Sequence, residues 1–216
     1  MKTINEKLEV LYNDWNQKHP GHFVSGGVVD EDMFASCDVR ILFLLKEVND
    51  MEQLENWSLV QLMKDQIERM KFYRIWETVG LWSFGLLQGF PAYEKLTYMK
   101  EANIIEGLLN IAMTNLKKTG GSGESDMEII KAHAIANKEL WLKEIEIIGP
   151  NVVICGGTFS IVQELLGFEI TTCDSGARVG RYNDMLFVEM YHPMYRISPK
   201  VFYAYFKETM IALGYK

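Results

Sequence analysis

The chain has 216 residues, of which 48% are hydrophobic and 24% charged, and its formal net charge is −7. This length and composition exclude a disordered or fibrous protein and favour one globular domain over residues 1–216 with a single sizeable core. The acidic excess excludes a surface that is basic overall, so any contact with nucleic acid must rely on local positive charge.

The N-terminal segment and the cysteines bear on compartment and cofactors. The first ten residues, MKTINEKLEV, are polar and helical in character, unlike a signal peptide, and no apolar run has the length of a membrane span. Cys37, Cys155 and Cys173 are far apart in the sequence and form no C-x-x-C pair. Such cysteines are typical of a reducing compartment and do not predict a thiolate metal site. We therefore expect a monomeric cytoplasmic protein that binds no membrane, metal or other cofactor.

The first half of the chain begins with a helix and contains two expected strands. Residues 3–18 place their apolar side chains at helical spacing. Residues 39–50, VRILFLLKEVND, contain a short continuous apolar run that is typical of a strand buried on both faces. Residues 19–22, HPGH, have two histidines but no evident third ligand, and we expect a loop there. By the same criteria, we expect two helices within residues 52–90, one helix over 93–109 and a second strand within 110–118.

The second half of the chain alternates between helices and strands. Residues 124–148 are expected to be helical, with Ser125 and Glu128 as a capping box. A helix over residues 158–167 is expected to begin with Thr158 as its N-cap. The other elements of this half are two buried strands within residues 149–157 and 185–191, a short strand and a turn between them, and a C-terminal helix over 198–214.

The alternation of helices and strands predicts the fold class. We expect an α/β protein with three layers, in which helices cover both faces of a central, mainly parallel sheet of four strands. In such sheets, ligands bind beyond the carboxyl ends of the strands. The four expected strands are followed by Lys46-Glu47-Val48-Asn49-Asp50, Asn115-Leu116-Lys117-Lys118, Gly156-Gly157-Thr158 and His192-Pro193. A carboxylate, an amide, a glycine pair and an imidazole should therefore meet at one edge of the sheet and form a site.

These segments resemble, in their order and spacing, the uracil-DNA glycosylase superfamily over roughly residues 39–213. VVICGGTFSIVQELLG, residues 152–167, is similar to the strand–helix unit of that family. YHPMYRIS, residues 191–198, stands where the family has a His-Pro-Ser motif. IAMTNLKK, residues 111–118, resembles the strand whose final Asn reads the base, and LFLLKEVND, residues 42–50, takes the place of the first motif, Gly-Gln-Asp-Pro.

The sequence departs from the family within several of these motifs. Leu45 and Val48 replace the Gly and Pro of the first motif, and Lys46-Glu47 stands in place of Gln-Asp. Glu47 thus keeps the carboxylate of the family's Asp, on a side chain that is longer by one methylene group. Met194 replaces the Ser after His-Pro, and the four cysteines that hold an iron–sulfur cluster in some members are missing. These departures bear on the activity rather than on the fold.

The resemblance implies a DNA glycosylase, which hydrolyses the N-glycosidic bond of uracil or another damaged base that is flipped out of DNA. Glu47 would orient the attacking water and stabilise the developing sugar cation electrostatically. His192, restricted to an extended backbone by Pro193, would donate a hydrogen bond to pyrimidine O2 as negative charge grows there. Asn115 would read N3–H and O4 of uracil, because its amide has both a donor and an acceptor. Asn110 is the alternative base reader.

Further candidates concern base stacking and phosphate contacts. GLWSFG, residues 80–85, loosely resembles the family's GL-x-FS stretch, so Trp82 and Phe84 are candidates for stacking on the base. Asn49 is a further candidate for binding the base. For each candidate the alternative is a structural role, such as a core position for the aromatic residues and a solvated turn for the lysines. Phosphate contacts are expected from residues near the strand ends, namely Lys46, Lys117, Lys118, Gly157 and Arg196.

Two other functions stay open beside DNA base excision. The same fold could hydrolyse a free nucleoside or nucleotide, which the acidic net charge favours because a small ligand needs no long basic surface. The protein could also be a catalytically silent member that binds nucleic acid or protein, which the departures at Leu45, Val48 and Met194 favour. The expected partner is therefore single- or double-stranded DNA, with a small nucleoside as the alternative.

Overall fold

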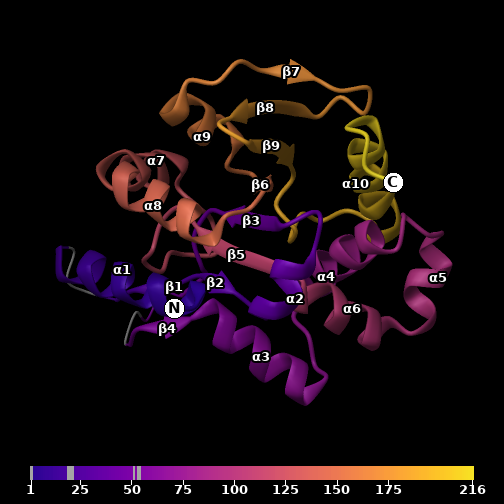
Figure 1. The fold of residues 1–216 in the computed structure, drawn as a ribbon, viewed down its shortest axis with the longest axis horizontal. Coiled ribbons are helices and arrows are strands. Elements are labelled where there is room, and N and C mark those ends of the chain that lie inside the picture. The colour runs from indigo at the N-terminus through magenta and orange to yellow at the C-terminus, as the bar shows by residue number, and fades with distance from the viewer. Residues whose placement is uncertain (1, 19–21, 51, 53–54) are drawn as a thin grey trace.

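The computed structural model describes residues 2–18, 22–50, 52 and 55–216, which form a mixed α/β protein with a mainly parallel central sheet (Figure 1). Strands β5, β3, β6 and β9 are parallel to their neighbours in this group, whereas β2, β8 and β7 pair in antiparallel fashion. In spatial order, the seven strands of the sheet within the described residues are β2 (Gly27–Val28), β5 (Ile111–Asn115), β3 (Ile41–Leu45), β6 (Val152–Gly156), β9 (Met185–Met190), β8 (Arg178–Tyr182) and β7 (Thr171–Thr172).

The four strands expected from the sequence are thus the parallel centre of a larger sheet, and antiparallel strands extend it at both edges. Strand β8 joins β9 through a two-residue turn in which Asn183 has a φ of 51°, a left-handed conformation that is favoured in tight hairpins. The sequence pattern of β8 is weak because Arg178, Gly180 and Arg181 interrupt its apolar residues. A continuous apolar run marks only strands that are buried on both faces.

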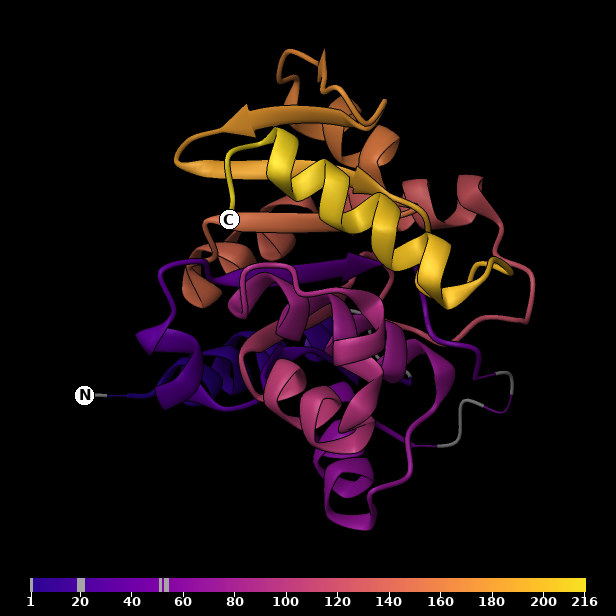
Figure 2. The same ribbon diagram turned by 90° about the vertical axis from the view of Figure 1, so that its right-hand side faces the viewer.

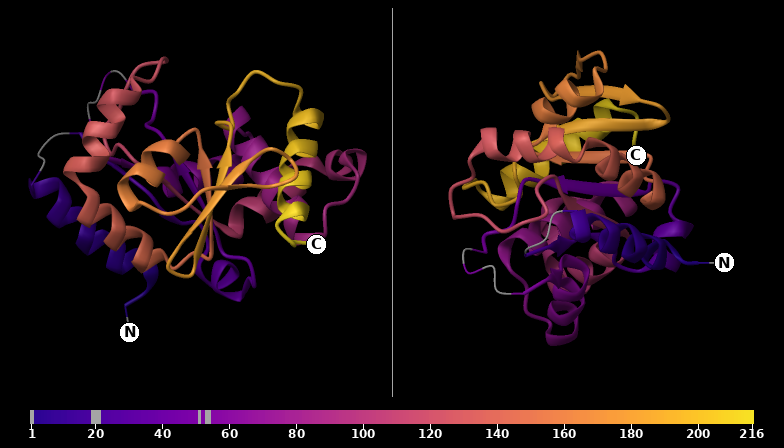
Figure 3. Two further views of the ribbon diagram at one scale, coloured as in Figure 1. Left: turned by 90° about the horizontal axis from the view of Figure 1, so that it is seen from above. Right: turned by 90° about the vertical axis from the view of Figure 1, so that its left-hand side faces the viewer.

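Helices cover both faces of the sheet. Alternate residues of β3 enter two separate apolar clusters, with Ile41, Phe43 and Leu45 in one and Leu42 and Leu44 in the other. Figure 2 shows α10 crossing one face, and the left view of Figure 3 shows α1, α7 and α8 on the opposite side. The first cluster includes residues of α3 (Leu59–Arg69), α4 (Arg74–Leu87), α5 (Tyr93–Tyr98), α6 (Lys100–Leu109) and α10 (Pro199–Ala212). The second includes residues of α1 (Ile4–Lys18), α2 (Glu31–Ser36), α7 (Met127–Ala136), α8 (Lys138–Ile148) and α9 (Phe159–Leu166).

Two segments that were each expected to be one helix are divided. The segment 93–109 is interrupted at Met99, which has φ −123° and ψ 58°. The segment 124–148 is interrupted at Asn137, whose side chain donates a 2.9 Å hydrogen bond to the His133 carbonyl and so competes with the helical pattern. The predicted capping box is also wrong, because Asp126, not Ser125, accepts the first amide hydrogen bonds of α7.

The N-terminal third contains short elements that the sequence pattern did not predict. Besides α2 and β2, these are β1 (Val24–Ser25) and β4 (Trp57–Ser58), which pair in parallel. Of the HPGH segment, residues 19–21 lie outside the described residues, whereas His22 is buried. Thr158 precedes α9 as expected, but its hydroxyl donates to the Leu44 carbonyl at 2.9 Å and ties the helix start to β3. Over the described part of the chain, no helix combines the length and apolar character needed to cross a membrane.

Candidate active site at the carboxyl ends of the parallel strands

A cleft of about 520 Å³ lies at the carboxyl ends of the central strands. It is lined by Glu47, which follows β3, by Asn115, the last residue of β5, and by His192, which follows β9. An acid, an amide and an imidazole therefore meet at one place, as the strand ends indicated. Other walls come from β4, from α3, from the start of α4 and from the loops after β5 and β9.

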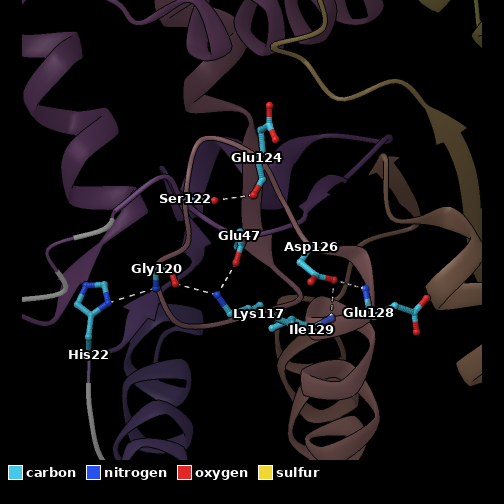
Figure 4. A network of polar contacts seen from close by, with 9 residues as sticks. All are labelled: His22, Glu47, Lys117, Gly120, Ser122, Glu124, Asp126, Glu128 and Ile129. Atoms are coloured by element: carbon cyan, nitrogen blue, oxygen red, sulfur yellow. Dashed lines mark hydrogen bonds and ion pairs between the residues drawn. The ribbon is translucent and has the colours of Figure 1, made fainter.

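The carboxylate of Glu47 forms an ion pair with the ammonium of Lys117 (Figure 4). The two side chains are nearly buried, at 5% exposed for Glu47 and 9% for Lys117. The Lys117 ammonium also donates a 2.7 Å hydrogen bond to the Gly120 carbonyl. A methyl group added at Gly121 would overlap the Glu47 carboxyl group. Glu47 is thus held between a lysine and the loop backbone.

The loop after β5 is fixed to the segment after β3 by backbone hydrogen bonds. The Gly121 amide donates to the Val48 carbonyl at 2.8 Å, and the Asp50 amide donates to the Gly121 carbonyl at 3.0 Å. The Gly120 amide donates to His22 Nδ1 at 3.3 Å (Figure 4). The segments that follow β3 and β5 therefore form one connected wall beside the cleft.

The imidazole of His192 is set up as a neutral hydrogen-bond donor. The Met194 amide donates to its Nδ1 at 3.2 Å, which leaves the proton of a neutral ring on Nε2. Burial, together with the smaller effect of the nearby positive charge of Lys46, lowers the pKa of His192 from 6.5 to about 4. The Tyr195 amide donates to the His192 carbonyl at 2.8 Å and closes the turn after Pro193. At neutral pH, His192 can therefore donate from Nε2 without carrying a charge.

Asn115 is buried, with 2% of its surface exposed, and its side-chain Nδ2 has no hydrogen-bond partner among the described residues. A buried amide donor without a partner costs about 1–3 kcal/mol, so a ligand that accepts its hydrogen bond would recover this energy. Asn110, the alternative base reader, lies at the opposite end of β5. Its amide donates to the Glu106 carbonyl at 2.7 Å and its oxygen faces Cys37 Sγ at 3.0 Å. Its contacts are structural, and it does not line the cleft.

The expected stacking residues Trp82 and Phe84 are not in the cleft, and this prediction is corrected. Trp82 is 1% exposed, and its ring stacks on that of Phe206 in the core at a centroid distance of 4.8 Å. Phe84 packs against the same apolar cluster. Both belong to α4, whose apolar face meets α10 and α6 rather than the strand ends. The aromatic residues that line the cleft are Trp57, Tyr73, Trp76 and Tyr195.

Sequence reasoning missed these four residues for different reasons. Tyr195 follows His192 by three residues, so the strand-end rule could have found it. Trp57 belongs to β4, Tyr73 precedes α4 and Trp76 belongs to α4, and none of the three directly follows a strand of the central sheet in the sequence. No local pattern marks them, because the packing of α3 and α4 brings them to the cleft.

The lysines after β5 are not free for phosphate contacts, which is a second correction. Lys117 is paired with Glu47, as described above. Lys118 points to the opposite face of the sheet, where its ammonium lies 2.6 Å from Glu144 and also donates to the Thr114 hydroxyl. Burial lowers the pKa of Lys118, whereas the attraction to Glu144 opposes this shift. Both lysines are therefore engaged in internal ion pairs and do not belong to a surface that phosphates could contact.

The remaining candidates lie in or near the cleft. Lys46 and Asn49 line it. Gly157 is exposed, has a φ of +75°, and lies beside Lys46 and His192, so that a methyl group added there would be 3.8 Å from each side chain. Arg196 is exposed and follows the cleft residue Tyr195, but it does not line the cleft itself. Of the expected positive surface, Lys46 and Arg196 thus stay available near the site.

The cleft combines aromatic walls with a neutral imidazole donor, an unpartnered amide donor and a carboxylate. This combination suits a flat heterocycle that offers hydrogen-bond acceptors at its edge. Among the described residues, no three His, Cys, Asp or Glu side chains are grouped closely enough to hold a metal ion. No model of a known protein family matches the chain, and no curated protein matches it.

Proposed function

We propose that this protein is a hydrolase of N-glycosidic bonds with a three-layer fold of the uracil-DNA glycosylase type. Its substrate is a pyrimidine, uracil or another damaged base, that enters the cleft after flipping out of DNA. One observation carries the proposal: the buried Nδ2 of Asn115, which has no hydrogen-bond partner in the described part of the chain, shares a cleft with the neutral imidazole of His192 and the carboxylate of Glu47.

Base recognition is assigned to Asn115. Its Nδ2 donates to O4 of uracil, and its amide oxygen accepts from N3–H. In the free protein this donor is buried and has no partner among the residues that the structure describes, so binding of the base supplies a hydrogen bond that it otherwise lacks. A cavity of about 520 Å³ lies within the range that small-molecule ligands occupy, which supports a base and its attached sugar as the ligand.

Bond cleavage is assigned to His192 and Glu47. As the bond between the sugar and the base breaks, its electron pair moves to the base, and His192 Nε2–H donates a hydrogen bond to the growing negative charge on O2. The lowered pKa of His192 supports this role, because a neutral donor does not need to transfer its proton. Glu47 orients water toward the sugar carbon, accepts the proton that this water loses as its oxygen bonds to that carbon, and stabilises the positive charge that develops there. Lys117 and the backbone at Gly121 fix the position of this carboxylate.

A free nucleoside or nucleotide is the second candidate substrate, and one observation favours it. Lys117 and Lys118 are engaged in internal ion pairs, so fewer cations are available for a DNA backbone than the sequence suggested. On a chain with a net charge of −7, this reduces the electrostatic contribution to DNA binding. A nucleoside needs only the contacts within the cleft.

Release of uracil tests both candidates. The protein is incubated with uracil-containing single- and double-stranded oligonucleotides and, separately, with uridine and deoxyuridine, and free uracil is quantified by chromatography. Glu47→Gln alone would leave Lys117 buried without its partner and could unfold the protein. The informative variant is therefore Glu47→Gln with Lys117→Met, which removes both charges and should lower the release rate by a factor of at least about 100.

The matched control is Lys131→Met with Glu164→Gln, which removes an ion pair at the surface whose charged atoms lie 2.7 Å apart. Its removal should leave uracil release unchanged, since exposed pairs contribute about 0–1 kcal/mol to stability. Release from the nucleosides but not from the oligonucleotides would select the second candidate. The proposal fails if no substrate releases uracil, or if the folded double variant at positions 47 and 117 releases it as fast as the wild-type protein.

A further inference from the structure

Two exposed tyrosines stack on each other at the edge of the cleft. The rings of Tyr191 and Tyr195 have centroids 5.1 Å apart and an angle of 22° between their planes. They are 54% and 55% exposed, respectively. The ring of Tyr205, on α10, also contacts Tyr191, with centroids 5.8 Å apart. We call Tyr191 and Tyr195 the tyrosine platform.

The backbone beneath the tyrosine platform is well fixed. The Tyr195 amide donates to the His192 carbonyl at 2.8 Å, and the Ile197 amide donates to the Tyr195 carbonyl at 2.9 Å. From α4, the Arg74 guanidinium donates to the carbonyls of Tyr195 and Ile197 at 3.2 and 3.0 Å. The exposure of the two rings therefore belongs to an ordered turn, and a ligand that stacks on them pays little ordering entropy.

We infer that the tyrosine platform binds unpaired bases of a single-stranded nucleic acid next to the base that occupies the cleft. The inference rests on the proposed function, because it extends the base site along a strand. Tyr195 both lines the cleft and stacks on Tyr191, so the platform is continuous with the site. Aromatic side chains of this kind stack on successive bases of single strands. A duplex keeps the faces of its bases stacked on each other and cannot offer them without unpairing.

The charge distribution agrees with binding by stacking. Near the platform, Lys46 lines the cleft and Arg196 is exposed beside Tyr195, whereas Lys117 and Lys118 are engaged internally. Two cations would neutralise about two phosphates, which predicts that log K falls with log salt concentration with a slope of roughly −1.4. A protein that held DNA mainly through its phosphates would show a much steeper slope.

The experiment measures binding without requiring hydrolysis. A fluorescein-labelled 12-mer of thymidylate, which contains no uracil, is titrated with the protein in several salt concentrations, and anisotropy gives Kd. The single strand should bind at least about tenfold more tightly than its duplex with oligoadenylate. Tyr191→Ala with Tyr195→Ala should weaken single-strand binding about tenfold or more, whereas Phe at both positions should retain it. Tyr98→Ala is the control, since Tyr98 is 87% exposed but lies outside the cleft.

The outcomes separate this inference from the proposed function. Equal binding by the double Ala variant and the wild type, equal binding of single strand and duplex, or the absence of strand binding in low salt would each overturn the platform. If uracil or nucleoside cleavage is still observed in such a case, the proposed function stands by itself. If the strand binds through the two tyrosines but no substrate ever releases a base, the platform stands and the hydrolase proposal fails.

Discussion

At the scale of single residues, the half-buried imidazole of His192 couples the stability of the protein to pH. Its pKa is 6.5 in an unfolded chain and about 4 in the folded one. Between these values the unfolded state takes up a proton that the folded state does not, so stability falls as pH decreases. The contribution is therefore fully present above pH 6.5 and is lost progressively as pH falls to about 4.

This coupling predicts that the wild-type protein and the variant His192→Asn differ in how their free energy of unfolding depends on pH. Comparison of wild type with His192→Asn in urea unfolding at pH 7, 5.5 and 4.5 isolates the contribution of His192 from that of other groups. The free energy of unfolding of the wild type should fall more steeply, by an extra amount on the order of 2–3 kcal/mol over this range. If the two proteins lose stability in parallel, the imidazole is not kept neutral by its surroundings.

Asn115 and Asn110 should respond in opposite ways to replacement by Ala. Asn115→Ala removes a buried donor that has no partner among the described residues, but it also removes the packing of the side chain. The two effects oppose each other, so stability should change by less than about 1 kcal/mol while affinity for uracil falls at least about fivefold. Asn110→Ala removes hydrogen bonds to Glu106 and Cys37, so stability should fall by about 1–2 kcal/mol with unchanged affinity. Calorimetric titration with uracil and urea unfolding measure the two quantities. The reverse pattern would make Asn110 the base reader.

At the scale of elements, the loop between β5 and α7 determines where the Glu47 carboxylate lies. Its glycines differ in their surroundings: a methyl group at Gly121 would overlap the Glu47 carboxyl group, whereas one at Gly123 would have no atom within 4 Å. The overlap at Gly121 is with the end of the Glu47 side chain and not with backbone, so an added methyl group displaces the carboxylate rather than the chain. The position of the carboxylate, rather than the fold, therefore depends on this glycine.

Gly121→Ala should accordingly reduce uracil release much more than stability. We expect a loss of at least about tenfold in rate, because a small displacement of a catalytic group has a large effect on reaction geometry. Thermal unfolding and the chromatographic assay give the two values. Gly123→Ala is the matched substitution in the same loop: Gly123 also lines the cleft, but its added methyl group would have no atom within 4 Å, so stability should be unchanged and release should fall less than in Gly121→Ala. Normal release by Gly121→Ala would mean that the carboxylate position is unimportant for the reaction.

At the scale of the whole molecule, the aromatic residues separate into a core and a cleft. Trp82 stacks with Phe206 between the sheet and α10, so it stabilises the fold. Trp82→Leu should lower the free energy of unfolding by about 3 kcal/mol and leave the affinity for uracil unchanged, because the ring does not reach the cleft. Urea unfolding and calorimetric titration test both parts. Loss of affinity for uracil in a fully folded Trp82→Leu protein would mean that Trp82 does contribute to base binding.

The sequence by itself determined the parallel centre of the sheet and the polar groups at its edge. The runs ILFLL, IAMTN and VVICG are buried on both faces, and MLFVEM is buried except for Met185 and Glu189, so each reads as a continuous or nearly continuous apolar segment by itself. Once four such strands are parallel, their carboxyl ends share one edge, so Glu47, Asn115 and His192 had to approach one another.

Only the tertiary structure decided which charges and rings face the cleft. Lys117 and Lys118 are neighbours in the sequence, yet one binds Glu47 and the other binds Glu144 on the opposite face of the sheet. The partner of a charge depends on which distant segment packs beside it, and the aromatic walls depend in the same way on the placement of α3 and α4. Such pairings leave no recognisable pattern in the sequence, whereas a strand buried on both faces leaves a short continuous apolar run.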